Sequence, residues 1–98
     1  MTIYLKNKHT LEIDNFKFRC SIGKNGKSKK KVEGDKKTPK GIFSLDKLYY
    51  RRDKVNKPIT KLDCIPINKK MGWCDDAKSK QYNRLIKLPF NYSHEKIW

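Results

Sequence analysis

Residues 33–43 read Glu-Gly-Asp-Lys-Lys-Thr-Pro-Lys-Gly-Ile-Phe, and this segment decides how the rest of the chain is interpreted. Gly34 permits a positive φ angle, and the side chain of Asp35 can bond to the backbone two residues further on. Pro39 fixes its own φ angle and pushes Thr38 towards an extended conformation. The spacing therefore predicts one specific turn, which leads directly into a strand at the apolar end of the segment.

Further short motifs lie on both sides of this turn. They are Arg19-Cys20-Ser21-Ile22-Gly23 and Gly26 before it, and Tyr49-Tyr50-Arg51-x-Asp53, Gly72-Trp73-Cys74-Asp75-Asp76, Tyr82-Asn83-Arg84 and Ser93-His94-Glu95-x-x-Trp98 after it. Each motif alone is weakly specific. Together, and in this order, they resemble the L,D-transpeptidase (YkuD-type) family of bacterial cell-wall enzymes over nearly all of residues 16–98.

The resemblance implies a fold class that is mostly β. In the family, short strands form mixed sheets in a β-sandwich-like domain with little helix. The resemblance also implies a function, because an L,D-transpeptidase acts on peptidoglycan stem peptides through a cysteine acyl-enzyme, needs no cofactor and cross-links the cell wall. We therefore expect stem peptides as partners, and the cell envelope or periplasm as the location.

The family's catalytic Cys belongs to a His…Gly-Cys block that follows a later strand, and none of the three cysteines in this chain matches that block. The resemblance thus implies that residues 1–98 are the N-terminal part of a single catalytic domain, without its nucleophile. We expect this part to hold no catalytic residue, and to be inactive and poorly folded alone. His94 is the candidate for the substrate-binding groove.

The chain is strongly basic. Its 98 residues contain 25 Lys and Arg against 10 Asp and Glu, which gives a formal net charge of +15. A chain of this length forms at most one domain. Such a charge attracts polyanions, so the alternative function is a small basic protein that binds nucleic acid or another polyanion. The lysines are spread along the whole chain without a nucleic-acid motif, which favours a solvated surface.

Two other kinds of signal are missing from the sequence. The first eight residues hold no long apolar run, as a signal peptide or a membrane span requires. The three cysteines form no Cys-x-x-Cys pair, so the sequence specifies neither a disulfide framework nor a zinc site. We therefore expect no metal, and thiols that are reduced and half-buried.

Residues 2–22 predict short strands. Apolar and polar residues alternate there, and Asp14-Asn15 has the composition of a two-residue hairpin turn. The clearest alternation places four apolar residues on one face: Phe16, Phe18, Cys20 and Ile22. We expect this face to lie in the core, with Cys20 as a packing residue.

Residues 21–28 end in Gly-Lys-Ser, as a phosphate-binding loop does. Such a loop needs a glycine at its first position, where this chain has Ser21, and it must open a helix. A glycine and a proline follow too soon for a helix. We therefore expect a turn between strands instead of a nucleotide site.

Residues 42–50 form the next β-prone run. It ends at Tyr49-Tyr50-Arg51, where aromatic rings beside a cation have the composition of a stacking surface for a sugar or a base. We favour two half-buried tyrosines at a strand end beside a surface ion pair. Ile65-Pro66-Ile67 predicts a short edge strand, because Pro66 has no N–H to donate.

The densest chemical cluster is Met-Gly-Trp-Cys-Asp-Asp at residues 71–76. A metal site needs more ligands at set spacing than the distant His94 and Cys64 provide. A nucleophilic pair of Cys74 and His94 is chemically possible, although adjacent carboxylates disfavour a thiolate. We favour a structural turn, in which the Trp is packed and one of the carboxylates caps the next segment.

Overall fold

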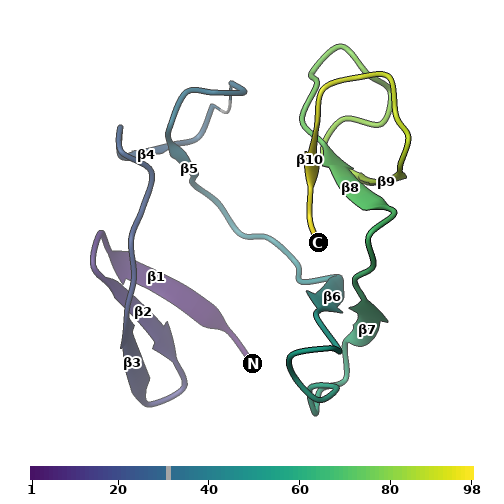
Figure 1. Ribbon diagram of the computed structural model, residues 1–98. Coiled ribbons are helices and arrows are strands. Elements are labelled where there is room, and N and C mark those ends of the chain that lie inside the picture. Colours follow the sequence, from purple (N-terminus) through teal and green to yellow (C-terminus); the bar gives the residue numbers. More distant parts are fainter. Residues whose placement is uncertain (31) are drawn as a thin grey trace. The chain divides into compact units, whose positions relative to one another are not determined.

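The computed structural model describes residues 1–30 and 32–98, and Figure 1 shows it as a ribbon. Every regular element in the described part of the chain is a β-strand, so the expected mostly-β fold with short strands is confirmed. The chain divides into two compact units, Met1–Ile42 and Phe43–Trp98. Among the described residues, none belongs to a helix long and apolar enough to span a membrane.

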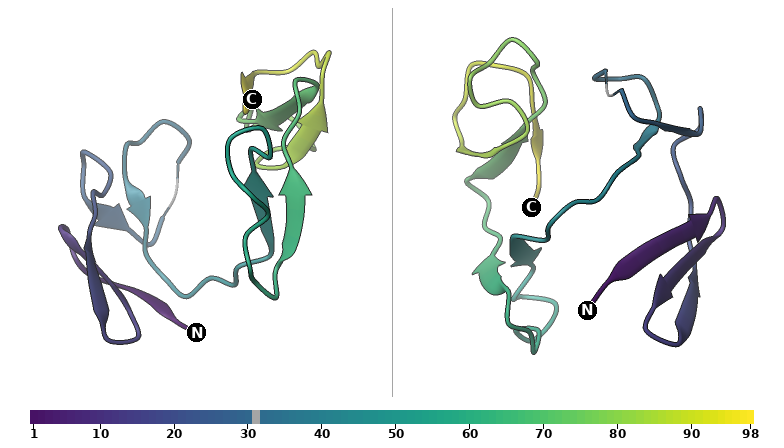
Figure 2. Two further views of the ribbon diagram at one scale, coloured as in Figure 1. Left: turned by 60° about the horizontal axis from the view of Figure 1, so that its bottom comes forward. Right: turned by 180° about the vertical axis from the view of Figure 1, so that it is seen from behind.

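The first unit begins with a three-stranded antiparallel meander (Figure 2). Its strands are β1 (Ile3–Asn7), β2 (Thr10–Ile13) and β3 (Phe16–Arg19), with β2 in the centre. The turn between β2 and β3 is the predicted two-residue hairpin, in which Asp14 has a φ of 52°. Asp tolerates this left-handed region because its short side chain can bond to nearby backbone.

The register of the meander sets six apolar residues on one face: Ile3, Leu5, Leu11, Ile13, Phe16 and Phe18. The expectation that this face is buried is wrong for its aromatic residues, since Phe16 is 68% exposed and Phe18 is 50% exposed. The other strands of this unit have only two residues each, too few to form a second layer over the face. Cys20 lies one residue beyond β3 and is half-buried.

The segment at residues 33–43 forms the predicted turn. Asp35 Oδ1 accepts a hydrogen bond from Lys37 N at 2.9 Å, two residues further on, and Gly34 has a φ of 80°. The turn leads into β5 (Thr38–Pro39), which pairs in parallel with β4 (Lys27–Ser28). The strand therefore lies inside the segment and not at its apolar end.

Thr38 connects this turn to the preceding part of the chain. Its Oγ1 accepts a hydrogen bond from Gly23 N at 2.7 Å, and its own N–H donates to the Gly26 carbonyl at 2.8 Å. Gly23 lies so close to the turn that a Cβ there would be 2.8 Å from Lys37 Cα. Residues 21–28 therefore form a turn and a short strand, as expected, and the helix of a phosphate-binding loop does not begin there.

The second unit contains two small sheets. In one, β6 (Lys47–Tyr50) and β7 (Asp63–Pro66) form a parallel pair. The other is antiparallel, with β8 (Met71–Cys74) between β9 (Leu85–Lys87) and β10 (His94–Lys96). Figure 1 shows the second sheet in green and yellow.

Two expectations for this region are wrong. The run at residues 42–50 is a strand only from Lys47 onwards. Three apolar residues before that point are exposed: Ile42, Phe43 and Leu45. Residues 71–74 form the central strand β8 and not a turn, because pairing on both sides outweighs the local preference of the sequence. The predicted short strand at Pro66 is confirmed by β7.

The core of the second unit is small and centres on β8. Cys74 is fully buried, and Ile86 of β9 is 8% exposed. Trp73 lies edge-on to Tyr49 with ring centroids 5.9 Å apart, and its Nε1–H donates to Asn83 Oδ1 at 3.0 Å. Trp73 is therefore packed, as expected, and it links β8 to β6 of the neighbouring sheet.

Candidate functional site

His94, the residue predicted for the substrate groove, is the first residue of β10. The register of β8 and β10 places it directly opposite Cys74. The next pair of facing residues is Asp75, which follows Cys74, and Ser93, which precedes His94. Asp75 N donates a hydrogen bond to the Ser93 carbonyl at 3.2 Å. His94 and Cys74 therefore form a non-hydrogen-bonded pair, the type in which facing side chains are closest and Cα atoms are about 4.5 Å apart.

The thiol and the imidazole of this pair bond to other groups. Cys74 has no exposed surface, and its Sγ lies 4.0 Å from the Asp76 carbonyl oxygen. His94 Nδ1 lies 2.7 Å from the Tyr92 carbonyl oxygen, which can only accept, so Nδ1 carries the donated proton. A catalytic thiolate needs both a base within reach and an open approach. The register brings the pair together, but the fold gives the thiol no access to a substrate.

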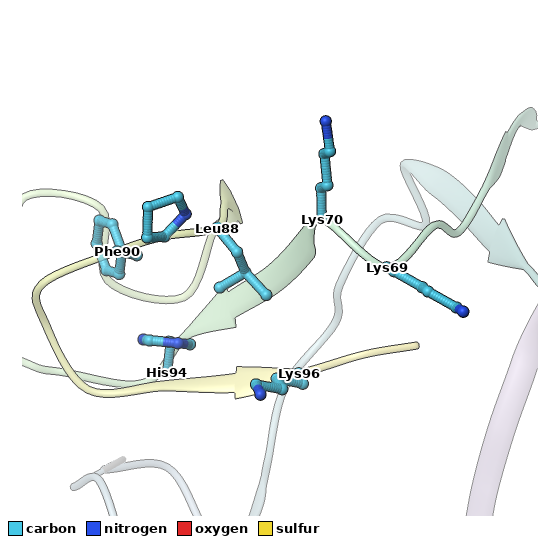
Figure 3. Close-up of a pocket in the computed structure, with 7 residues that line it drawn as sticks. Lys69, Lys70, Leu88, Phe90, His94 and Lys96 are labelled. Carbon is cyan, nitrogen blue, oxygen red and sulfur yellow. The ribbon is translucent and has the colours of Figure 1, made fainter.

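A pocket of about 430 Å³ opens beside His94 (Figure 3). Its lining comes from three segments: Lys69 and Lys70 before β8, Leu88, Pro89 and Phe90 after β9, and His94 and Lys96 on β10. Alternate residues of a strand point to the same side, so Glu95 is directed to the other face of β10. The described lining therefore combines cationic and apolar side chains without a carboxylate.

His94 lies beside Leu88 and Phe90, while the side chains of Lys69 and Lys70 extend away from this apolar floor (Figure 3). The Phe90 and His94 rings pack edge-on, with centroids 5.7 Å apart and planes at 73°. The contact of Nδ1 with the Tyr92 carbonyl fixes the other side of the imidazole. Nε2 is then the nitrogen left for a ligand, and in the neutral ring it accepts a hydrogen bond.

Gly72 sets the packing behind the pocket. A Cβ at this position would lie 2.8 Å from Ile86 Cδ1, 3.0 Å from the Glu95 carbonyl oxygen and 3.2 Å from Leu88 Cδ2. The absence of a side chain lets β9 and β10 approach β8 from both sides. A side chain at residue 72 would therefore collide with β10 and with Leu88 of the pocket floor.

The two carboxylates after β8 differ in their environment. Asp76 Oδ1 accepts a hydrogen bond from Lys78 N at 2.9 Å, which confirms the expected cap of the next segment. Asp75 Oδ1 is buried and has no hydrogen-bond partner among the described residues. A buried acceptor without a donor is unusual in folded proteins. Asp76 thus has a structural role, whereas Asp75 keeps one acceptor unused.

Arg51 follows β6 and holds a carboxylate and an aromatic ring. Its Nε and Nη2 donate to the two oxygens of Asp53 at 2.8 and 2.6 Å, and its Cζ lies 3.6 Å from the centre of the Trp98 ring. The hydrogen bonds lower the pKa of Asp53 below its usual value and raise the pKa of Arg51 above its own. Tyr49 and Tyr50 are half-buried, so the favoured interpretation of this motif as strand end and ion pair is confirmed.

A second pocket, of about 330 Å³, lies in the first unit. Its lining residues are His9, Arg19, Cys20 and Ser21, and Cys20 N donates to the His9 carbonyl at 2.9 Å. This backbone bond holds the two segments together. Within the described residues, no three or more His, Cys, Asp or Glu side chains gather closely enough to hold a metal ion.

The model of the L,D-transpeptidase catalytic domain family (YkuD) matches residues 1–96 of the 98-residue chain. The match covers the first unit and the second unit up to Lys96, and it includes every residue of the resemblance motifs except Trp98. The chain therefore belongs to this family, whose members act on peptidoglycan. A comparison with curated proteins found no match, and neither did a comparison with solved structures.

Of the residues that line this pocket, the sequence analysis predicted only His94. The three lysines were counted only in the overall charge, and the apolar residues of the floor were not among the candidate site residues. The spacing of His94 and Lys96 is the one local signal, because residues two positions apart on a strand point to the same side. The other lining residues are distant in sequence and meet only through the strand order.

Proposed function

We propose that this chain takes part in acyl transfer on peptidoglycan stem peptides. The observation that carries the proposal is the family match over residues 1–96. The pocket beside His94 supports the assignment of this residue to the substrate groove. In this proposal, residues 1–98 are the N-terminal part of a single catalytic domain and supply its sheet framework and part of the groove.

The chemistry of the proposed reaction requires a nucleophile and stabilisation of charge. A thiolate attacks the stem-peptide carbonyl next to a terminal D-residue, and backbone N–H groups stabilise the resulting oxyanion. Collapse of this intermediate forms the thioester and expels the terminal D-residue, whose amine takes up a proton. The amine of a second stem then attacks the thioester, forms the new amide bond and releases the thiol. The role that we assign to His94 in these steps is contact with the bound stem.

The nucleophile in this proposal is not one of the cysteines of residues 1–98. Cys74 is fully buried. The Sγ of Cys64 faces the carbonyl oxygens of Leu62 and Pro58 at 3.6 and 3.9 Å, and Cys20 is half-buried. In the described residues, none of these thiols has a hydrogen-bonded imidazole that could act as its base. We therefore expect residues 1–98 alone to bind stem peptides without converting them.

Two measurements test the proposal. Intact-mass spectrometry of the chain after incubation with a tetrapeptide stem should show no thioester, whereas a thioester on any of its three cysteines contradicts the assignment of the nucleophile. Sedimentation with purified peptidoglycan should show binding that is lost when an amidase has removed the stems. Binding that survives stem removal would mean that the chain recognises the glycan, or only its charge.

The net charge of +15 supports a second candidate, which is non-specific binding of a polyanion. The two candidates differ in their dependence on salt. Binding to phosphates releases counterions, so the affinity for DNA should fall steeply as salt rises. Binding to peptidoglycan that persists at high salt favours stem recognition, while a loss as steep as that for DNA favours the polyanion function.

A further inference from the structure

The pocket beside His94 has an electrostatic character that the family match does not specify. Three of its lining residues are Lys69, Lys70 and Lys96, and Glu95 is directed to the other face of β10. None of the three ammonium groups takes part in an ion pair within residues 1–30 and 32–98. Like charges around one opening repel each other, and an anion placed between them relieves that repulsion.

The floor of the pocket sets a second requirement for a ligand. Leu88, Pro89 and Phe90 provide apolar surface, and the rings of Phe90 and His94 form a T-shaped pair. A bare inorganic anion would lose hydration against such a floor and gain little in return. A small apolar group that carries a carboxylate matches both parts of the lining, because it covers the floor while its charge stays at the lysine rim.

His94 adds a polar contact at the floor. Its Nδ1 bonds to the Tyr92 carbonyl, so Nε2 is the nitrogen left for a ligand, and it accepts a hydrogen bond when the ring is neutral. A peptide N–H is a donor of the right kind. The pocket thus offers an acceptor for an amide, apolar surface for a small side chain and cations for a terminal carboxylate.

We propose that this pocket binds the C-terminal residue of a short peptide, with the carboxylate between Lys70 and Lys96 and the side chain against Leu88 and Phe90. The assignment rests on the proposed function, in which the peptide is a peptidoglycan stem. It goes further by naming the end of the stem that is held and the residues that hold it.

The test uses the 98-residue chain and four probes: a tetrapeptide stem with a free carboxylate, the same stem as its C-terminal amide, N-acetyl-L-alanyl-L-alanine and inorganic phosphate. Amide NMR shifts locate each probe and give its Kd. The free stem should shift the signals of Lys70, Leu88, His94 and Lys96. Because the amide lacks the charge, it should bind about tenfold more weakly.

Matched variants separate this pocket from the general charge of the chain. K70Q/K96Q should weaken binding of the free stem about tenfold, because both cations of the rim are lost. K54Q/K57Q removes the same charge from exposed positions outside the pocket and should leave Kd nearly unchanged. The unperturbed spectrum of each variant shows that it has folded.

Several outcomes overturn the assignment. Equal affinity for the acid and the amide, shifts that lie outside the pocket, or phosphate binding as tight as that of the stem would each exclude a peptide-carboxylate site. If the alanyl dipeptide binds the pocket as tightly as the stem, the carboxylate site stands and stem specificity is lost. If no peptide binds, the pocket assignment fails, and the peptidoglycan sedimentation decides the proposed function separately.

Discussion

His94 and Cys74 face each other across β10 and β8, and only the imidazole lines a pocket. The difference follows from the order of the strands. Cys74 ends the central strand, where Asn83 N and Arg84 O bond to its backbone from the side of β9. His94 begins the edge strand β10, and its side chain lines the pocket. The register thus brings the two residues to the same face of the sheet, and of the two only His94 lines a pocket.

Cys74 should be the slowest of the three thiols to react with iodoacetamide. It is fully buried, whereas Cys20 and Cys64 are half-buried, and alkylation needs contact between the reagent and the sulfur. Peptide mass spectrometry over a time course measures the three rates in one sample. In urea the rates should become similar. Early labelling of Cys74 in the folded chain would restore it as a candidate nucleophile.

Replacement of Gly72 by Ala should destabilise the second unit. The new methyl group would lie 2.8 Å from Ile86 Cδ1 and 3.0 Å from the backbone oxygen of Glu95. Extra atoms in a packed interior cost about 1–3 kcal/mol of the free energy of unfolding. Urea denaturation followed by Trp fluorescence measures this loss, because Trp73 lies in the same strand.

The double variant G72A/I86V provides the control. Ile86→Val removes the Cδ1 atom that the new methyl group meets first, so it should recover part of the stability lost in Gly72→Ala. Ile86→Val alone should lower the stability by about 1 kcal/mol, because it deletes a methyl group from the core. Simple addition of the two single effects would show that the steric contact with Ile86 does not limit this position.

The elements that were predicted correctly are those whose signals are local. Alternation on either side of Asp14-Asn15 identified the β2–β3 hairpin, because a two-residue turn fixes the register of its strands. Asp35 and Gly34 identified the central turn for the same reason, since their backbone preferences act within a few residues.

The elements that were missed depend on partners distant in sequence. Gly72 and the two aspartates indicated a turn, yet residues 71–74 are a strand because β9 and β10 pair with both edges. The Phe16 and Phe18 face was expected to be buried from its alternation, but a pattern in one strand cannot show whether a second layer covers it. The pocket beside His94 was missed because three separate segments form it.

Thr38→Val should loosen the central turn. The hydroxyl accepts the Gly23 N–H at 2.7 Å in a part-buried position, and valine has a similar shape but no acceptor. An amide left without its partner there should cost about 1 kcal/mol. Amide hydrogen exchange at Gly23 should become faster, and NMR measures it directly.

Thr60→Val is the matched control, because Thr60 Oγ1 accepts a 3.2 Å hydrogen bond from Leu62 N in an exposed loop. Equal effects on the exchange of Gly23 would exclude a specific role for Thr38.

The ion pair of Arg51 and Asp53 should make a contribution to the free energy of unfolding that is lost at low pH. The hydrogen bond from Arg51 lowers the pKa of Asp53 in the folded chain below its value in the unfolded chain. The contribution is therefore complete above the unfolded pKa, about 4 for Asp, and is lost as the pH falls through the lower, folded pKa. A carbon-13 NMR titration of the Asp53 carboxyl group measures the shift, and its sign is the prediction.

Two variants identify the source of that shift. Arg51→Gln should bring the Asp53 titration back towards its ordinary range, because it removes the largest cause. Lys54→Gln removes one positive charge next to Asp53 and should change the titration less, since the charge of Lys54 is the smallest cause. In the unsubstituted chain, the NMR shift of the Trp98 indole should change over the same pH range as the titration of Asp53. The reason is that Arg51 stacks on the indole ring at 3.6 Å while it is hydrogen-bonded to the Asp53 carboxylate. A Trp98 signal that stays constant through the Asp53 titration would show that the stacking does not depend on the ion pair.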